Sequence, residues 1–205
     1  MKQFSEACER NKHAILEVLR QVLTAPGVVL EVGSGTGQHA AFLSRNLSHL
    51  QWQPTDLAEN LASIRAWAAD EGPQNLLAPL VLDLLSSEWP VTQAQAIVCI
   101  NTIHIVSWAG VQQLFLGAGR LLPVGGIFYA YGAYRYADRP LEPSNQQFDR
   151  WLKVRDPVSG VRDFEAVNEL AKENGMLLVD DRAMPANNRS IWWTRTQTPP
   201  CLPIA

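Results

Sequence analysis

The chain has 205 residues, of which 47% are hydrophobic and 18% are charged, and its formal net charge at pH 7 is −3. This length and composition predict one globular domain that buries about 70% of the surface exposed by the unfolded chain. The slightly acidic balance offers no basic face for a phosphate backbone, so we do not expect nucleic acid as a partner.

The ends of the chain and its cysteines indicate where the protein works. The first residues are too polar for a signal peptide, and no apolar run has the length needed to span a membrane. The 3 cysteines are far apart and lack CxxC spacing, which is typical of reduced thiols and offers no metal site. We therefore expect a cytoplasmic protein without a membrane partner or a bound metal. The sequence predicts one domain over residues 1–198 and a flexible, proline-rich tail over 199–205.

Helix and strand patterns alternate along the chain. Apolar residues at helical spacing predict helices, and short β-branched runs bounded by polar or turn residues predict strands. The predicted helices cover residues 12–23, 38–46, 57–70, 111–122 and 163–174. The predicted strands cover residues 28–32, 49–53, 78–83, 94–101, 127–132, 176–180 and 189–195.

This order of elements predicts an α/β fold with one doubly wound sheet of mostly parallel strands. The last two predicted strands break the alternation, because the short segment DRAMPANN between them leaves no room for a helix. A parallel crossover needs about a dozen residues or more. We therefore expect the seventh strand to enter the sheet antiparallel to its neighbour.

A glycine-rich loop follows the first predicted strand. Gly33, Gly35 and Gly37 stand at alternate positions, and a predicted helix begins directly after them. Glycines permit close approach of the backbone to a ligand, and the start of a helix offers unpaired N–H groups to a carboxylate or phosphate. A dinucleotide fingerprint needs its third glycine at position 38, where this chain has Gln38. Glu31 would repel a pyrophosphate but attract a ligand that carries a positive amine.

Two further acids follow the next two predicted strands. Asp56 is placed to accept hydrogen bonds from a ribose diol. Asp83 follows the third strand, where an adenine amino group could donate to it. An amine-bearing carboxylate, a ribose and an adenine together describe S-adenosylmethionine. The alternative is that Glu31, Asp56 and Asp83 are ordinary strand-end acids facing water, but three acids after three successive strands beside this loop favour the ligand.

With these residues in place, the sequence resembles class I methyltransferases over nearly its whole length. VLEVGSGTG is similar to the first motif of that family, and INTIHIV and GRLLPVGGIFY are similar to its later segments. The turn before the fifth strand departs from the family's PGG, since it reads Pro123-Val124-Gly125-Gly126. The resemblance implies a Rossmann-like domain that binds S-adenosylmethionine, releases S-adenosylhomocysteine and holds no metal.

Four other segments resemble a narrower family, the bacterial relatives of methyltransferase-like protein twenty-six, which contain a domain of unknown function. They are ERNKHAILEVL, SNQQFDRWLKVRDP, GVRDFE and MPANNRS. This resemblance implies the fold and the cofactor, but it brings no known substrate with it.

The resemblance extends the expected cofactor site to the residues around the motifs. Ser34 lies inside the glycine loop, Leu57 and Leu84 directly follow two of the acids, and Asn101 stands at the mouth of the fourth strand. Asn11 precedes the first predicted helix, and in folds of this type a leading segment can cover the cofactor. A plain helix cap is the alternative role for Asn11.

His104 is the candidate general base for the acceptor. It follows Asn101 where the methyl group would point, and an imidazole titrates in the useful range. The alternative is a histidine that is hydrogen-bonded within its loop or packed on the cofactor. Tyr131 ends the fifth predicted strand, and we expect it to contact the substrate. Asn187 and Asn188, before the last strand, are expected to face the acceptor or, alternatively, to cap their turn.

Residues 133–161 are too long for a plain connector between two elements. Their polar sequence at this edge of the sheet predicts a lid-like insertion with Trp151 on its underside. A solvated insertion without a role in binding is the alternative.

The sequence therefore predicts an S-adenosylmethionine-dependent methyltransferase that acts on a small-molecule acceptor by in-line transfer. One alternative is a module that binds the same cofactor without catalysis. Another is a nicotinamide-dependent oxidoreductase, against which Gln38 and Glu31 both argue. Nothing in the sequence indicates the acceptor or the oligomeric state.

Overall fold

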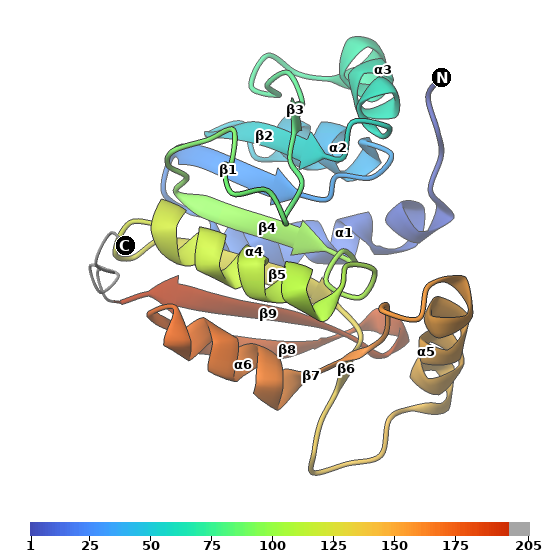
Figure 1. Ribbon diagram of the computed structural model, residues 1–205. Helices are drawn as coiled ribbons and strands as arrows, with labels where there is room; N and C mark the ends of the chain where they lie inside the picture. The colour runs from blue at the N-terminus through green and yellow to red at the C-terminus, as the bar shows by residue number, and fades with distance from the viewer. Residues whose placement is uncertain (197–205) are drawn as a thin grey trace.

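A seven-stranded sheet forms the centre of the molecule (Figure 1), and the computed structural model describes residues 1–196. Its strands are β1 (Gly27–Val32), β2 (Leu50–Asp56), β3 (Leu80–Val81), β4 (Ala96–Ile100), β5 (Ile127–Gly132), β8 (Met176–Met184) and β9 (Asn188–Arg195). They are ordered β3-β2-β1-β4-β5-β9-β8. The order reverses between β1 and β4, so the carboxyl ends of these two strands flank the switch point where ligands bind in open sheets.

The antiparallel last strand is confirmed. β9 pairs antiparallel with both β5 and β8, while β1, β2, β3, β4 and β5 pair in parallel. A single short turn, Pro185–Asn187, joins β8 to β9, and such a turn permits only a hairpin. The sixth predicted strand ends at residue 180, but β8 continues to Met184, because β9 provides pairing partners up to that residue.

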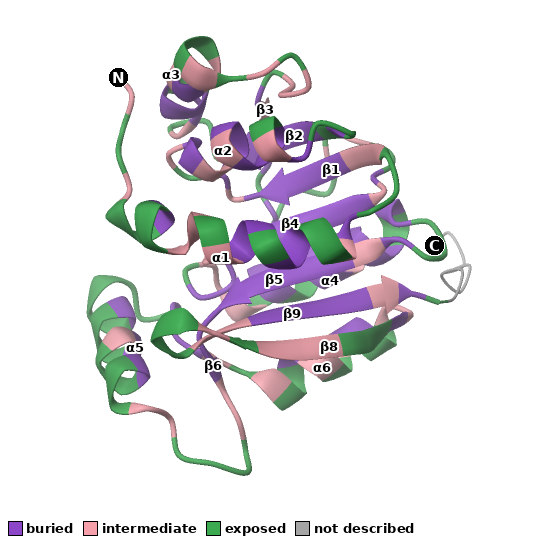
Figure 2. Ribbon diagram, turned by 180° about the vertical axis from the view of Figure 1, so that it is seen from behind, coloured by how far each residue is buried: buried purple, intermediate pink, exposed green. Residues whose placement is uncertain are grey.

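Six helices accompany the sheet in the described residues. They are α1 (Glu6–Val22), α2 (Gln38–Asn46), α3 (Leu61–Glu71), α4 (Trp108–Leu121), α5 (Pro143–Arg155) and α6 (Phe164–Glu173). Helices α4 and α6 lie on the face of the sheet that is turned to the viewer in Figure 1, and α1 and α2 lie on the face shown in Figure 2. All five residues of β4 are buried, as expected for a strand covered on both faces.

Side chains of β1 alternate between the two cores. Leu30 and Val32 pack into the cluster beneath α4 and α6, and Val29 packs into the cluster beneath α1 and α2. Because successive strand residues point to opposite faces, Glu31 must share the α1–α2 side with Val29. This direction decides what its carboxylate can reach.

The starts of three helices differ from the sequence-based prediction, and one of them, α4, begins at Trp108 rather than at residue 111. Helix α1 begins at Glu6, where the side chain of Ser5 accepts a hydrogen bond from the backbone of Cys8. Asn11 therefore lies inside α1, and the prediction that it precedes the helix was wrong. Helix α3 begins at Leu61 rather than at residue 57, because residues 57–60 form a turn instead.

The insertion after β5 contains its own elements. Two short strands, β6 (Tyr134–Arg135) and β7 (Arg162–Asp163), pair in parallel, and α5 lies between them in the chain. Figure 1 shows α5 beyond the edge of the sheet where the parallel strands end. The predicted tail, 199–205, and the predicted domain boundary at 198 lie outside the described residues. No helix among residues 1–196 combines the length and the apolar character needed to cross a membrane.

Candidate cofactor and acceptor site

The glycine loop turns sharply from β1 toward α2. The backbone N–H groups of Gly33 and Ser34 both donate to the carbonyl oxygen of Thr55, each at 3.0 Å. Thr102 donates from Oγ1 to the carbonyl oxygen of Gly33 at 3.2 Å, and a Cβ atom on Gly33 would lie only 2.3 Å from that Oγ1. Glycine is therefore required at position 33 by the close approach of the two loops.

Asp56 holds the same loop from the neighbouring strand. Its Oδ2 accepts a hydrogen bond from the N–H of Gly35 at 2.6 Å, and its Oδ1 accepts from Leu57 N at 2.7 Å and Asn60 Nδ2 at 2.8 Å. A carboxylate offers about four lone-pair sites. Asp56 therefore fixes two loops and still has capacity for a donor on a ligand.

A cavity of about 330 Å³ opens beside these groups. Six of the predicted cofactor contacts line it: Gly33, Gly35, Asp56, Leu57, Asp83 and Leu84. Its volume lies within the range of roughly 300–1,000 Å³ that is usual for small-molecule sites. The structure thus brings together the glycine loop and the second and third acids at the switch point of the sheet.

Exposed apolar side chains form much of the cavity wall. Leu57, Leu85 and Ile105 are 42%, 62% and 50% exposed, respectively. An apolar ligand surface that covers them would gain about 25 cal/mol for each Å² removed from water. The wall suits a flat, apolar ring system with a few polar groups at its edges.

Several residues that line the cavity were not predicted from the sequence. Asn60 belongs to the turn after β2, and Thr102, Ile105, Val106 and Ser107 belong to the loop between β4 and α4. Ile105 and Val106 provided a signal, because two β-branched apolar residues follow His104 in a segment read as a loop. No sequence pattern indicated that Asn60 lines the cavity, since position 60 lay in the helix predicted over residues 57–70.

Glu31 does not line the cavity. Its carboxylate is 2% exposed, and its Oε2 accepts hydrogen bonds from Ser34 Oγ at 2.8 Å and Trp52 Nε1 at 3.1 Å. Burial raises the pKa of Glu31 to about 7, although these two donors oppose the shift. Strand alternation points Glu31 toward α1 and α2, and its contact with a ligand stays a prediction.

Two further predicted contacts shape the loop from behind. Ser34 is buried and bonded to Glu31, and Gly37 lies so close to α3 that a Cβ atom would stand 2.6 Å from Ile64 Cα. Neither residue lines the cavity. They contribute to the shape of the loop, and direct contact with a ligand stays a prediction for both.

Asn101 and Asn11 lie next to Tyr131 rather than in the cavity. Asn101 adopts a left-handed backbone with φ of 55°, and its N–H donates to the carbonyl oxygen of Tyr131 at 2.8 Å. Asn11 lies close enough to the Tyr131 hydroxyl to oppose the upward shift that burial gives its pKa, and its Oδ1 lies 2.8 Å from Nε2 of His39. Backbone strain of this kind is concentrated at functional sites. Tyr131 itself is buried.

His104 is fully buried, which the sequence analysis did not foresee. Its ring packs edge-on against Tyr134 and Phe148, with centroids 5.7 and 6.1 Å apart, and neither ring nitrogen has a hydrogen-bond partner among the described residues. Burial, together with the nearby charge of Arg162, lowers the pKa of His104 to about 3. The ring is therefore neutral and sealed from solvent, and the alternative of a side-chain hydrogen bond within its loop was wrong. The role of general base stays a prediction.

The other predicted substrate contacts are engaged elsewhere. Trp151 is 54% exposed and stacks on Phe148, and its place on the underside of the insertion stays a prediction. Asn187 donates from Nδ2 to Ser144 Oγ at 2.9 Å and accepts at its carbonyl from Asn145. Asn188 donates to the carbonyl of Pro185 at 3.1 Å, which confirms the turn-capping alternative for this residue.

The sequence pattern of one protein family spans almost the whole chain. The family is described as "Protein of unknown function (DUF938)", and its pattern matches residues 2–195. The chain belongs to this family. The DUF938 assignment agrees with the resemblance to an uncharacterised family, and it establishes no reaction.

Solved structures share the fold of this DUF938 protein. An O-methyltransferase family protein from Burkholderia thailandensis superposes with a TM-score of 0.81 at 15% identity, over 93% of this chain and 58% of the other. Human N-acetylserotonin methyltransferase, solved in complex with SAM, gives 0.69 at 16% identity, over 91% and 55%. A chain from the complex of the Haloferax volcanii Trm112 methyltransferase activator with a methyltransferase gives 0.73 at 13% identity, over 93% and 92%.

These likenesses confirm the Rossmann-like methyltransferase fold. The DUF938 chain spans little more than half of the first two neighbours, and at these identities the comparison shows the fold alone. What this chain binds and transfers must therefore be argued from its own residues.

Proposed function

We propose that this DUF938 protein is an S-adenosylmethionine-dependent methyltransferase acting on a small-molecule acceptor. One observation carries the proposal: Asp56, Asp83 and the exposed apolar side chains of Leu57 and Ile105 line a single cavity beside the glycine loop. A cytoplasmic location and the absence of a metal belong to the same proposal. They rest on the cysteine spacing.

The residues of the cavity fit the nucleoside of this cofactor. The apolar wall suits an adenine ring, and Asp56 has unused acceptor capacity for the ribose hydroxyls. Oδ1 of Asp83 accepts from Leu85 N at 2.9 Å, which orients the carboxylate and leaves Oδ2 for the adenine amino group.

The amino-acid end of the cofactor would lie over the glycine loop. A Cβ atom on Gly35 would meet nothing within 4 Å, so the backbone is open to a ligand at this position. The start of α2 adds the positive end of a helix dipole for the carboxylate. Glu31, behind Ser34, would attract the ammonium group once its own carboxyl is ionised.

The bound cofactor supplies an activated methyl group, so the protein's tasks are alignment and the exclusion of water. Alignment alone can contribute about 7–11 kcal/mol in favourable cases. A pKa of about 3 makes the sealed His104 a weak proton acceptor. The described residues therefore favour an acceptor whose nucleophilic atom already carries a free electron pair at neutral pH. For His104 to act as a general base, the insertion would have to open and expose its ring.

Titration calorimetry tests the proposal directly. We expect S-adenosylmethionine and S-adenosylhomocysteine to bind, and NADH not to bind, because Gln38 fills the place of the third dinucleotide glycine with bonds to Ser5 and Glu9. Replacement of Asp83 by Ala should weaken both ligands, whereas Asp138→Ala, at an exposed site in the insertion, should not. No binding of either ligand at millimolar concentration would end the proposal.

A second function, cofactor binding without catalysis, is favoured by one observation. The side chains of Asn187 and Asn188, two of the predicted acceptor residues, are hydrogen-bonded to the protein itself, and the third residue, Tyr131, is buried. Incubation with a methyl-labelled cofactor and a metabolite extract separates the two functions. Labelled product is the result expected for a methyltransferase, and tight binding of S-adenosylhomocysteine without any product would favour the binding module.

A further inference from the structure

The loop between β4 and α4 joins the cofactor cavity to the insertion. Ile105 and Val106 line the cavity on one side of this loop. The ring of His104 packs on the other side, against Tyr134 and against Phe148 of α5. The conformation of the loop therefore sets the position of one cavity wall.

Four consecutive carbonyl groups of this loop are held by one short segment, residues 158–162. Arg162 Nε donates to Ile103 O at 3.1 Å, Gly160 N donates to His104 O at 2.8 Å, and Ser159 Oγ donates to Ile105 O at 2.9 Å. Arg162 Nη2 donates to Val106 O. Loops at a protein surface usually leave such carbonyls to water. Here the end of the insertion binds every one of them.

Arg162 supplies the largest share of these contacts. Its guanidinium is half-buried, and Nη2 also donates to Val158 O at 2.9 Å, so it serves three backbone carbonyls at once. A planar guanidinium with five donors can satisfy several fixed acceptors, which an ammonium group cannot do in the same geometry. The same segment is also bonded to α5, because Val161 N donates to Asp149 Oδ1 at 2.9 Å.

We infer that Arg162 is a positioning residue for the nucleoside end of the cofactor cavity. It holds residues 103–106 so that Ile105 and Val106 form a closed wall, although Arg162 itself does not line the cavity. The inference rests on the proposed function, since the wall is assigned to the adenine of the cofactor. It also means that the insertion is fastened to the cofactor loop along residues 158–162 and is not a free lid.

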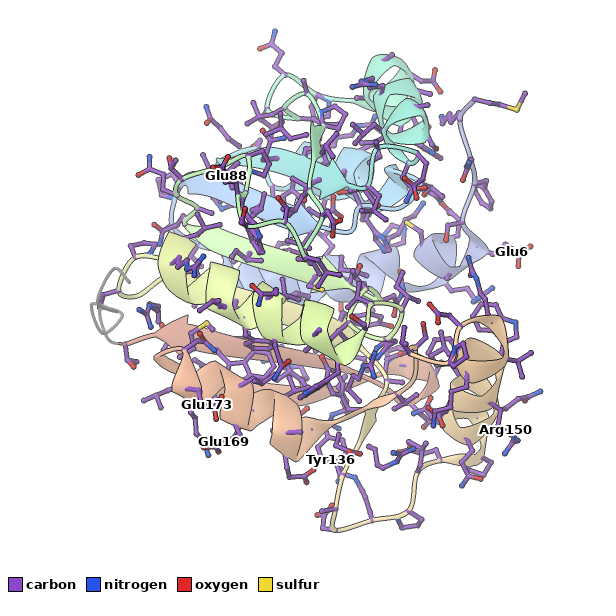
Figure 3. All side chains as sticks on the ribbon, viewed as in Figure 1. Glu6, Glu88, Tyr136, Arg150, Glu169 and Glu173 are labelled. Atoms are coloured by element: carbon purple, nitrogen blue, oxygen red, sulfur yellow. The ribbon has the colours of Figure 1, made fainter. Side chains whose placement is uncertain are left out.

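Calorimetry with S-adenosylhomocysteine tests this role. We expect Arg162→Met to raise the Kd by about tenfold, as for the loss of a few hydrogen bonds that order a binding wall. Thermal unfolding of the same variant shows whether it is folded. Arg150→Met is the matched control, because Arg150 is an exposed arginine of α5 that points away from the molecule in Figure 3. The Kd of this variant for S-adenosylhomocysteine should equal that of the unaltered chain.

A double-mutant cycle distinguishes positioning from a general structural role. If Arg162 acts through the loop, Arg162→Met and Ile105→Ala together should weaken binding by less than the product of their single effects. Arg162→Met combined with Leu57→Ala, on the β2 side of the cavity, should raise the Kd by the full product of the two single effects. Equal behaviour of the two cycles would overturn the inference.

Ser159→Ala provides a second test if Arg162→Met does not fold. It removes only the bond to Ile105 O, and we expect about a threefold rise in Kd. An unchanged Kd in a folded Arg162→Met variant would overturn this inference but not the proposed function. If Arg162→Met does not fold, an unchanged Kd in Ser159→Ala would do the same. Failure of the unaltered chain to bind S-adenosylhomocysteine would overturn the proposed function and this inference with it.

Discussion

The two halves of the carboxyl edge of the sheet use their polar side chains differently. Beside β1, β2 and β3, Asp56 and Asp83 face a cavity, and each keeps acceptor capacity after its bonds to the backbone. Beside β5 and β9, the predicted polar groups are buried or bonded to the protein: Tyr131 is buried, and Asn187 donates to Ser144. The proposed cofactor half is thus preformed, whereas the proposed acceptor half is closed in this conformation.

The two halves differ because different elements of the chain hold their polar side chains in place. The acids of the cofactor half lie within one or two residues of a strand end, so the sheet itself fixes them. The acceptor half is built by the insertion and by the β8–β9 turn, which must satisfy their own backbone groups through side chains. An acceptor would have to displace some of these bonds or open the insertion.

The largest expected effect concerns Glu31, which lies behind the cofactor loop. Because the folded state raises its pKa from 4.5 to about 7, the folded chain keeps a proton that the unfolded chain releases. The free energy of unfolding should therefore fall by about 3 kcal/mol between pH 4.5 and 7 through this residue. Urea denaturation of the unaltered chain and of Glu31→Gln across this range should show that difference, and parallel pH profiles would show that Glu31 is not buried as described.

The cofactor half depends most on Asp56. In Asp56→Asn the amide replaces a carboxylate that accepts three hydrogen bonds, so the loop at Gly35 loses its charged acceptor. We expect the Kd for S-adenosylhomocysteine to rise by about 100-fold. Asp138→Asn, in an exposed part of the insertion, is the control. Equal affinities for the two variants would remove the distinction between the halves.

The sealed state of His104 makes a prediction for the acceptor half. A Cβ atom on Gly132 would lie 2.0 Å from His104 Nε2, so Gly132→Ala should destabilise the fold by about 2 kcal/mol through overpacking. In a His104→Ala background, where the ring is gone, the same change should cost less. Chemical denaturation of the four variants of this cycle measures the difference, and identical costs in both backgrounds would mean that the ring does not occupy this place.

The smallest effect is expected for Asn188. Its side chain bonds only to carbonyls of its own turn, so Asn188→Ala should lower the free energy of unfolding by about 0.5 kcal/mol. The affinity for S-adenosylhomocysteine should not change. Once an acceptor is known, a loss of turnover much larger than the loss of stability would restore the predicted substrate contact.

Local sequence signals were sufficient for most of the sheet. The β-branched runs and their Gly and Pro boundaries located all seven strands, and the short DRAMPANN segment predicted the antiparallel β9. They failed at α1, where the capping residue Ser5 lies in a segment without apolar periodicity. They also failed at residues 57–60, whose turn is fixed in part by the bond from Asn60 to Asp56 across the loop.

The sequence by itself determined the strand order along the chain, the glycine loop, and the acids that follow β2 and β3, because these depend on residues close together in the chain. Only the tertiary structure decided which side chains share a cavity. The direction of Glu31 follows from the two cores on either side of β1, and the sealing of His104 follows from Gly132, Tyr134 and Phe148, which lie far from it in sequence. Burial is a property of long-range packing, and no local pattern around residues 31 or 104 records it.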